Sequence, residues 1–213
     1  MPTDTAEVLI PPDATLPVLR EIAAGCRACD LWERGTQTVF GAGGARADLF
    51  FAGEQPGNDE DLAGKPFVGP AGKLLDRALA EAGIDRTKAY VTNVVKHFKW
   101  EARGKRRIHA KPNAAEVKAC MPWLRAEIRE VKPEIIICLG ATAAQALIGK
   151  TFRVTKQRGE LLPFALASAI MATWHPSAIL RAPDEAARRQ QTAELVEDLQ
   201  RAAIWLEQHK RVA

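Results

Sequence analysis

Four cysteines are the residues of this chain best suited to binding a metal. Only two residues separate Cys26 from Cys29, which brings two thiols onto one turn of chain, and Cys120 and Cys138 follow at long intervals. A zinc ribbon has two close cysteine pairs, and this chain has one. Four thiolates can hold either zinc or a [4Fe–4S] cluster. We therefore predict a four-cysteine metal site, with a buried core thiol as the alternative for Cys138, which lies in an apolar run.

A carboxylate and an amide directly follow the first apolar run. Glu54 and Gln55 stand within Gly53–Gly57, where glycines and a proline make a rigid turn after residues 49–52. A carboxylate in this position can activate a nucleophile or stabilise a cation. The glycine-rich segment 41–48 precedes the apolar run, whereas a Rossmann fingerprint would follow it.

The basic residues are concentrated in one segment. Residues 96–111 contain seven lysines and arginines and one glutamate, although the whole chain carries a formal net charge of only +4. Such a patch on a slightly acidic body suits a polyanionic partner. The segment also contains His109, whose imidazole is a nucleophile when it is neutral. A solvated histidine that touches phosphate is the simpler alternative.

Four further side chains stand where they could bind a ligand. Asn93 lies in the apolar run 90–95, His175 follows the run 165–173, and Ser177 comes two residues after His175. Phe67 lies in the segment 65–75, from which its ring could stack on a planar group. The simpler alternatives are a strand-end cap for Asn93, a turn for His175 and a core contact for Phe67.

These residues need a sheet to bring them together. Apolar runs predict strands over 49–52, 90–95, 134–140 and 165–173. Helical spacing predicts helices over 15–32, with an interruption near Gly25, and over 74–83, 113–130, 141–149 and from Asp184 onward. The alternation predicts an α/β fold, a three-layer αβα sandwich around a mainly parallel four-stranded sheet. The loops 53–70, 96–111 and 175–183 would then leave the carboxyl ends of the strands, where ligands bind. We expect one domain over residues 1–213, with a flexible leader over residues 1–12.

Composition argues against a membrane-spanning, a secreted and an intrinsically disordered protein. No apolar run reaches 18 residues, and the first residues resemble no secretory signal, so we expect a cytoplasmic protein whose cysteines are reduced. Charged residues make up 26% of the chain, which argues against intrinsic disorder.

Taken together, these motifs resemble the uracil-DNA glycosylase superfamily, specifically the iron–sulfur branch that contains family four. The resemblance rests on Gly53–Gly57, Lys65–Leu75, Thr92-Asn93, Trp174–Ser177 and the four cysteines. Two features depart from family four, namely Gln55 in place of alanine and the inserted segment Gly104–His109. Both are similar to family X, whose members excise uracil and stay covalently joined to the DNA through the histidine of that loop.

The resemblance implies a role for each candidate residue. It implies catalytic roles for Glu54, His109 and His175, substrate binding by Gln55, Phe67 and Asn93, DNA contacts by Lys105, Arg106, Arg107 and Ser177, and a [4Fe–4S] cluster on Cys26, Cys29, Cys120 and Cys138. The expected partner is uracil-containing DNA, single strands included, and we expect a monomer. In this hypothesis His109 bonds to C1′ of the abasic sugar.

Two alternatives remain open at this point. One is a family-four type of enzyme in which water captures the sugar and His109 only contacts phosphate. The other is an iron–sulfur protein that binds nucleic acid without catalysis.

Overall fold

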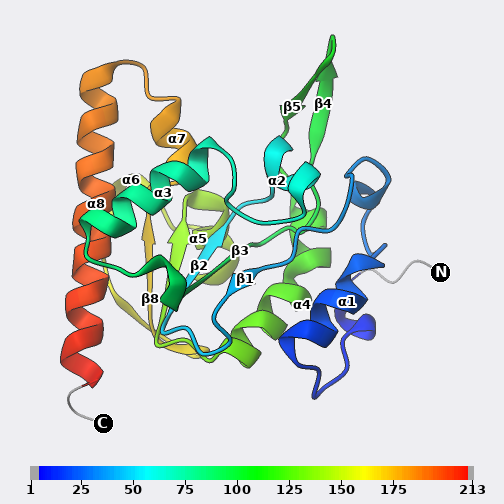
Figure 1. Cartoon of the computed structure of the whole chain (residues 1–213), viewed down its shortest axis with the longest axis horizontal. Coiled ribbons are helices and arrows are strands. Elements are labelled where there is room, and N and C mark those ends of the chain that lie inside the picture. Colours follow the sequence, from blue (N-terminus) through cyan, green and yellow to red (C-terminus); the bar gives the residue numbers. More distant parts are fainter. Residues whose placement is uncertain (1–4, 211–213) are drawn as a thin grey trace.

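The computed structural model describes residues 5–210 of the chain. Its main sheet has six strands in the order β1-β3-β2-β6-β8-β7 (Figure 1). They are β1 (Ala42–Gly43), β2 (Leu49–Gly53), β3 (Ala89–Asn93), β6 (Ile135–Leu139), β7 (Leu162–Phe164) and β8 (Ala167–Thr173). The four strands β3, β2, β6 and β8 run parallel, and the edge strands β1 and β7 are antiparallel to their neighbours.

The prediction of four strands was therefore wrong in number, although the four predicted strands form the parallel centre of the sheet. The two additional strands contain two and three residues. Segments this short carry no hydrophobic period of their own, so only their pairing with β3 and β8 defines them.

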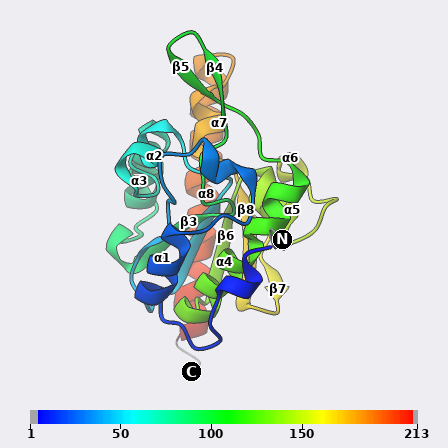
Figure 2. The ribbon, with the colours of Figure 1, turned by 90° about the vertical axis from the view of Figure 1, so that its right-hand side faces the viewer.

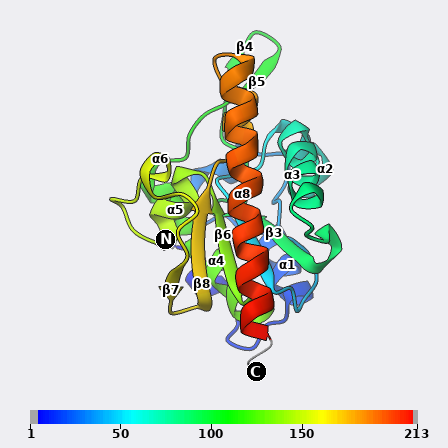
Figure 3. The same cartoon turned by 90° about the vertical axis from the view of Figure 1, so that its left-hand side faces the viewer.

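Helices cover both faces of the sheet, which confirms the three-layer arrangement. On one face lie α1 (Leu16–Ala24), α4 (Ala114–Val131), α5 (Ala141–Leu147) and the short α6 (Val154–Gln157) (Figure 2). On the other face lie α3 (Pro70–Glu81), α7 (Pro176–Leu180) and α8 (Glu185–Lys210) (Figure 3). Strands β2, β3 and β6 are buried along their whole length because each face of the sheet is covered.

Alternating side chains of the strands build the two halves of the core. Phe50 and Ile136 point into the layer of α1 and α4, whereas Phe51 and Ile137 point into the layer of α3 and α8. This alternation follows from the two-residue period of a strand.

Helix ends follow local signals in the sequence. The side chain of Asn113 accepts a hydrogen bond from the backbone N–H of Glu116, and the Glu116 carboxylate accepts one from the N–H of Asn113, so a capping box opens α4. Asp184 accepts from the N–H of Ala187 at the start of α8, as predicted. Helix α3 begins at Pro70, four residues earlier than predicted, because proline is well suited to the first turn.

The amino-terminal region shows the interruption predicted near Gly25 and one difference from the expectation. Helix α1 ends at Ala24 and the 3-10 helix η2 (Asp30–Glu33) follows, with the Cys26–Cys29 segment between them. Part of the expected leader is packed, because η1 (Ala6–Leu9) contacts α4 and buries Ala6 completely. Residues 1–4 of that leader lie outside the described residues.

Two segments predicted as loops contain regular structure. The segment 53–70 includes α2 (Asn58–Ala63), and the basic segment forms a hairpin of β4 (Trp100–Arg103) and β5 (Arg106–His109). Gly104 has φ +60° at the hairpin tip, which suits the tight turn there. The hairpin projects from the edge of the sheet at which the parallel strands end (Figures 1 and 2). A short 3-10 helix, η3 (Arg86–Lys88), precedes β3. Within residues 5–210, no helix is both long and apolar enough to cross a membrane.

Candidate active site

The predicted site residues meet at the carboxyl edge of the parallel sheet. Strands β2 and β3 end opposite each other at Gly53 and Asn93, and β6 and β8 end at Leu139 and Thr173. The side chains that follow these ends line one cavity of about 1090 Å³. Among its lining residues are Glu54, Gln55, Phe67, Asn93, His109, His175 and Ser177. The cavity thus lies at the edge of the sheet where the sequence predicted that ligands bind.

Three predicted ligand-binding side chains converge on Gly53. A Cβ atom at this position would lie 2.3 Å from Asn93 Oδ1, 2.9 Å from Phe67 Cζ and 3.4 Å from His175 Nε2. A side chain at position 53 would therefore occupy the point at which the amide, the aromatic ring and the imidazole come together. The absence of a side chain on Gly53 lets these three side chains approach the end of β2 closely.

Phe67 reaches the cavity through an unusual backbone conformation. Its φ is +56°, a left-handed value that costs a bulky residue free energy and is found mainly where the surrounding structure imposes it. Gly72 in α3 makes room for it, because a Cβ there would lie 1.7 Å from the carbonyl oxygen of Phe67. The ring of Phe67 lies 6.2 Å from that of His175 and nearly parallel to it. It therefore forms an apolar wall of the cavity.

His175 presents a hydrogen-bond donor to this cavity. Its Nδ1 accepts a hydrogen bond of 3.0 Å from the backbone N–H of Ser177, so Nδ1 carries no proton. Burial lowers the pKa of His175 to about 4, and the ring is therefore neutral at pH 7. The single proton of the neutral ring must then sit on Nε2, the atom beside Gly53. The Ser177 hydroxyl lies 2.8 Å from Nδ1 and thus turns toward His175 rather than outward.

The carboxylate of Glu54 is held at both oxygens. Oε1 lies 3.2 Å from His109 Nε2, and Oε2 accepts a hydrogen bond from the Thr142 hydroxyl. Burial by itself raises the pKa of Glu54, but the hydrogen bonds from His109 and Thr142 outweigh it and leave the pKa below its ordinary value. Glu54 is therefore an anion at neutral pH, and it stands next to the imidazole of the hairpin.

Gln55 turns away from the centre of the cavity and holds the base of the hairpin. Its Oε1 accepts from the N–H of Lys99 at 3.0 Å, and its Nε2 donates to the carbonyl oxygens of Lys99 and Ala110, each at 3.1 Å. One buried amide thus connects the two chain segments that enter and leave the hairpin. The structure gives Gln55 hydrogen bonds to the hairpin, where the sequence predicted bonds to substrate.

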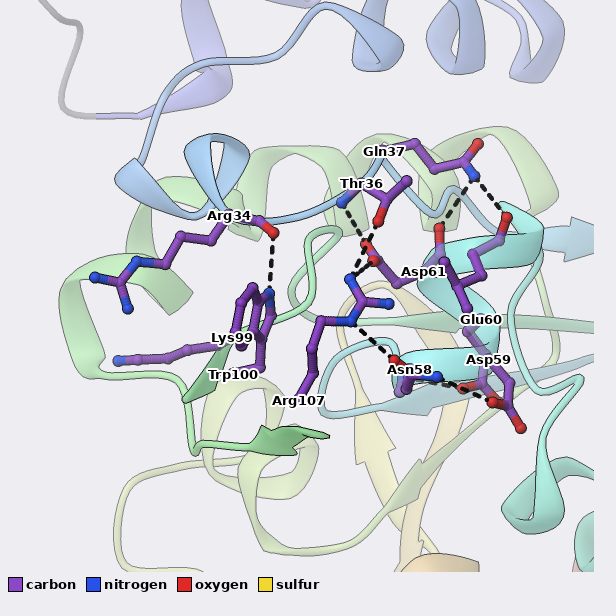
Figure 4. A network of polar contacts seen from close by, with 12 residues as sticks. Arg34, Thr36, Gln37, Asn58, Asp59, Glu60, Asp61, Lys99, Trp100 and Arg107 are labelled. Atoms are coloured by element: carbon purple, nitrogen blue, oxygen red, sulfur yellow. Dashed lines mark hydrogen bonds and ion pairs between the residues drawn. The ribbon is translucent and has the colours of Figure 1, made fainter. Parts of the chain in front are cut away.

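Arg107 fastens the middle of the hairpin to the body of the protein (Figure 4). Its Nη1 lies 2.7 Å from Asp61 Oδ2 and donates to Thr36, and its Nε donates to Asn58 Oδ1 at 2.9 Å. On β4, Trp100 Nε1 donates to the carbonyl oxygen of Arg34 at 2.9 Å. The guanidinium predicted to contact DNA is therefore bound within the protein.

The remaining predicted DNA contacts lie at the hairpin tip. Lys105 lies in the turn from β4 to β5, Arg106 is the first residue of β5, and both are exposed. They form a small basic surface beyond the cavity, whereas Arg107 and Ser177 face inward. Two of the four predicted DNA-binding side chains thus point where a phosphate could meet them.

The structure brings together three of the four cysteines. Burial, with smaller contributions from the nearby thiols of Cys29 and Cys26, raises the pKa of Cys120 to about 12. Burial also raises the pKa of Cys138 in β6, but no charge interaction connects it with the other three thiols among residues 5–210. In the same residues, no three His, Cys, Asp or Glu side chains are arranged as a metal site. Cys138 thus lies apart from the other three thiols in strand β6, and the four-cysteine site stays a prediction.

His97 is a buried side chain beside this thiol group that the sequence did not single out. It lines a small cavity of about 160 Å³ together with Cys26, and the backbone N–H of the preceding Lys96 donates to Cys120 Sγ at 3.2 Å. Thr38 donates its hydroxyl proton to the carbonyl oxygen of Ala23, so His97 Nε2 must be the donor in its 2.9 Å contact with Thr38. Burial lowers the pKa of His97 to about 4, which keeps the ring neutral.

His97 therefore carries its one proton on Nε2 and has a free lone pair on Nδ1. Nδ1 has no hydrogen-bond partner within the described part of the chain. Metal-binding histidines usually donate their second ring nitrogen to a neighbouring oxygen, as Nε2 does here. His97 Nδ1 is therefore a candidate fourth ligand beside the thiols of Cys26, Cys29 and Cys120. The local signal in the sequence was weak, because a single histidine in an apolar segment is most often a core residue.

Comparisons with known proteins identify the superfamily that the sequence motifs resemble. Residues 40–200 match the family model of the uracil DNA glycosylase superfamily. The chain is 36% identical over 173 residues to a type-4 uracil-DNA glycosylase of Archaeoglobus fulgidus, an alignment that covers 78% of this chain and 83% of that protein. It is 35% identical over 190 residues to a type-4 uracil-DNA glycosylase of Thermotoga maritima, with 89% and 93% covered. It also matches 16% of a DNA polymerase of Bacillus phage SP01, at 33% identity over 154 residues.

Proposed function

The chain belongs to the uracil-DNA glycosylase superfamily, and from this premise we propose that it excises uracil from DNA and then bonds to the abasic sugar through His109. The observation that supports excision best is the convergence of Asn93, Phe67 and His175 on Gly53, with Glu54 beside them. A base in a duplex must leave the stack before an enzyme can reach its glycosidic bond. The cavity at the sheet edge is the place where such a base would enter.

Asn93 and Phe67 recognise the base. A side-chain amide offers an acceptor and donors, which match the N3–H and O4 of uracil, whereas cytosine presents the opposite pattern. Asn93 lines the cavity, where its Oδ1 can accept a hydrogen bond from N3–H. The ring of Phe67 supplies the apolar face on which a flat base stacks.

His175 and Glu54 stabilise the charges that develop as the bond breaks. When the N1–C1′ bond breaks, its electron pair leaves with the base, and the sugar becomes cationic. The Nε2–H of the neutral His175 donates to the developing negative charge at O2 of uracil. The Glu54 anion, held by Thr142, lowers the energy of the cationic sugar.

Two nucleophiles could then capture C1′. The named relatives are type-4 glycosylases, and this favours the alternative in which water attacks and the enzyme turns over. A specific contact in this chain favours His109 instead. Its Nε2 lies 3.2 Å from Glu54 Oε1, at the mouth of the cavity, on a hairpin that Gln55 and Arg107 hold in place.

Once the Glu54 anion has stabilised the cationic sugar, it accepts the proton of His109 Nε2, which leaves a neutral imidazole with its proton on Nδ1 and a lone pair on Nε2. That lone pair forms the bond to C1′ after the base has left as an anion, and the anion takes up a proton from solvent. An alkylated imidazolium is a poor leaving group, so each protein molecule acts once.

Lys105 and Arg106 extend the site toward the DNA backbone. Exposed cations at the tip of the hairpin can neutralise phosphates next to the flipped nucleotide, an interaction that carries no sequence preference and weakens with salt. We expect binding to single strands in particular, since their bases need no extrusion from a duplex.

For the cofactor, we propose that Cys26, Cys29, Cys120 and His97 hold a [4Fe–4S] cluster. These residues come from the segment after α1, from α4 and from the chain after β3, so a cluster would join three elements of one face of the sheet. When bound, it supplies structural cross-linking, because hydrolysis or transfer of a glycosyl group involves no electron transfer.

A denaturing gel with a labelled oligonucleotide that carries one uracil tests the proposed function. The proposal expects free uracil together with a band that is shifted by the mass of the protein and survives heat and detergent. Free uracil with an abasic product and no shift would establish the water-dependent alternative. The absence of uracil release would leave only nucleic-acid binding. An oligonucleotide with thymine in place of uracil is the matched control.

A further inference from the structure

We infer that Thr142 is a positioning residue that orients the Glu54 carboxylate toward His109 and the cavity. The inference deepens the proposed function and rests on it for the role of Glu54. It is based on the division of the two carboxylate oxygens between Thr142 and His109.

The backbone that leads to Thr142 is held where strand β6 ends beside strand β8. Strand β6 ends at Leu139, and the N–H of Gly140 donates to the carbonyl oxygen of Thr173 at 2.9 Å. Gly140 has φ +86°, and a Cβ there would lie 2.9 Å from His175 Cβ, so the turn passes directly against the catalytic imidazole. Thr142 follows in the first turn of α5 and is buried. The same short turn therefore contacts His175 and Glu54.

Glu54 depends on this contact for its orientation. A glutamate carboxylate rotates about three side-chain bonds, and one hydrogen bond leaves much of this freedom. Oε1 faces His109, which belongs to a projecting hairpin. Oε2 faces Thr142, a buried residue in the first turn of α5. Thr142 is thus the partner that would hold the carboxylate even if the hairpin moved.

The contact also favours one charge state of Glu54. The hydroxyl of Thr142 has a single proton, and it donates that proton to Oε2. A hydrogen bond donated to a carboxylate stabilises the anion. Both proposed roles of Glu54, toward the cationic sugar and toward the His109 proton, require the anion.

The variants Thr142→Val and Thr142→Ser test the inference. Valine keeps the volume and removes the proton, whereas serine keeps the hydroxyl. We expect the acid limb of the pH–rate profile for uracil excision to move upward by about one pH unit in Thr142→Val. The rate should fall by up to tenfold on the acid limb, at pH values below the Glu54 pKa of both proteins, with a change of less than threefold at pH 8. Thr142→Ser should restore the profile, and Thr192→Val on α8 is the control for the same exchange away from the site.

A measurement without DNA separates this inference from the proposed function. Nuclear magnetic resonance of protein labelled with ¹³C at glutamate carboxyls, with the Glu54 signal assigned from Glu54→Gln, reports its titration directly. We expect the Glu54 titration to move to higher pH in Thr142→Val and to return in Thr142→Ser. An unchanged titration in a folded Thr142→Val protein would overturn the inference, whether or not the wild-type protein releases uracil. Failure of the wild-type protein to release uracil would overturn only the proposed function.

Discussion

Arg107 Nη1 lies 2.7 Å from the buried Oδ2 of Asp61, so a hairpin strand and helix α2 are joined by an ion pair. His109 lies two residues beyond Arg107 on the same strand, and side chains two residues apart share a face of a strand. The ion pair that fastens Arg107 therefore also sets where His109 points.

Replacement of Arg107 by methionine should separate the two proposed activities. The variant keeps most of the apolar stem but loses the bonds to Asp61, Thr36 and Asn58, so the hairpin is released from α2. We expect adduct formation to slow at least tenfold, with uracil release changed less than threefold. Arg189→Met on the exposed face of α8 is the control, and equal loss of both activities in Arg107→Met would contradict the assignment.

His109→Ala should remove the adduct and leave excision. Cleavage requires Glu54, Asn93 and His175, none of which changes, and water can then capture C1′. The measurement is the yield of heat-stable shifted band against the yield of free uracil from the same reaction. If a folded His109→Ala protein released no uracil, the hairpin histidine would belong to the cleavage step itself.

Gly53→Ala should block the cavity with little loss of stability. The added Cβ would lie 2.3 Å from Asn93 Oδ1 and 2.9 Å from Phe67 Cζ, so both side chains must move away from the base. We expect uracil release to fall by at least a hundredfold, because Asn93 and Phe67 would no longer be placed to bind the base. Gly44→Ala, where a Cβ would meet nothing nearer than 4.0 Å, is the matched control. Normal activity of Gly53→Ala would mean that the base binds elsewhere.

Metal content should distinguish the two candidate ligand sets. We expect Cys120→Ser and His97→Ala to lose most of the bound iron, His97→Cys to keep it with a fourth thiol, and Cys138→Ser to keep it without change. Iron per chain and visible absorbance of the purified proteins are the readouts. Loss of iron from Cys138→Ser, with retention in His97→Ala, would restore the four-cysteine site predicted from the sequence.

Protonation of His175 should destabilise the fold in mild acid. Burial lowers the pKa of His175 from 6.5 to about 4, so between these values the unfolded chain binds a proton that the folded protein does not. The free energy of unfolding should therefore be highest above pH 6.5 and should decrease as the pH falls toward 4. Since a tenfold difference in proton affinity is worth about 1.4 kcal/mol, we expect a loss on the order of 2 kcal/mol from this residue.

Urea unfolding of the wild-type protein and His175→Asn at several pH values measures that loss. The decrease should be smaller in His175→Asn, and His209→Asn on the exposed end of α8 serves as the control. An identical pH dependence in wild type and His175→Asn would show that the imidazole is not neutral and buried as described.

The sequence was sufficient for the parts of the fold that follow from short-range patterns. Apolar runs located the four parallel strands, Asn113 and Asp184 located two helix starts, and the alternation of strands and helices predicted the layers. Because parallel strands end at one edge, it also followed that Glu54, Asn93 and His175 would meet. The motifs carried the family assignment, which the comparisons confirmed at the level of the superfamily.

Tertiary structure alone decided which partner each polar side chain has. Arg107 is basic in sequence and could contact phosphate, but Asp61 lies within reach only after α2 and the hairpin have packed. Gln55 bonds to Lys99 and Ala110, and its nearest neighbours in sequence do not indicate this. The physical reason is that a hydrogen bond requires an approach within about 3 Å in a given direction, and for residues far apart in the chain only packing sets that approach.

The same reason explains why the sequence alone could not choose between the two sets of metal ligands, the four cysteines and the three cysteines with His97. Cysteine spacing determined that thiols were available, and it placed Cys26 next to Cys29. It also placed Cys138 in a predicted strand, but it could not determine that this strand would hold Cys138 away from the other thiols, or that His97 would follow Lys96 to the side of Cys120. Residue types and spacing thus define which chemistry the chain can perform, and the packing of the elements decides which atoms perform it.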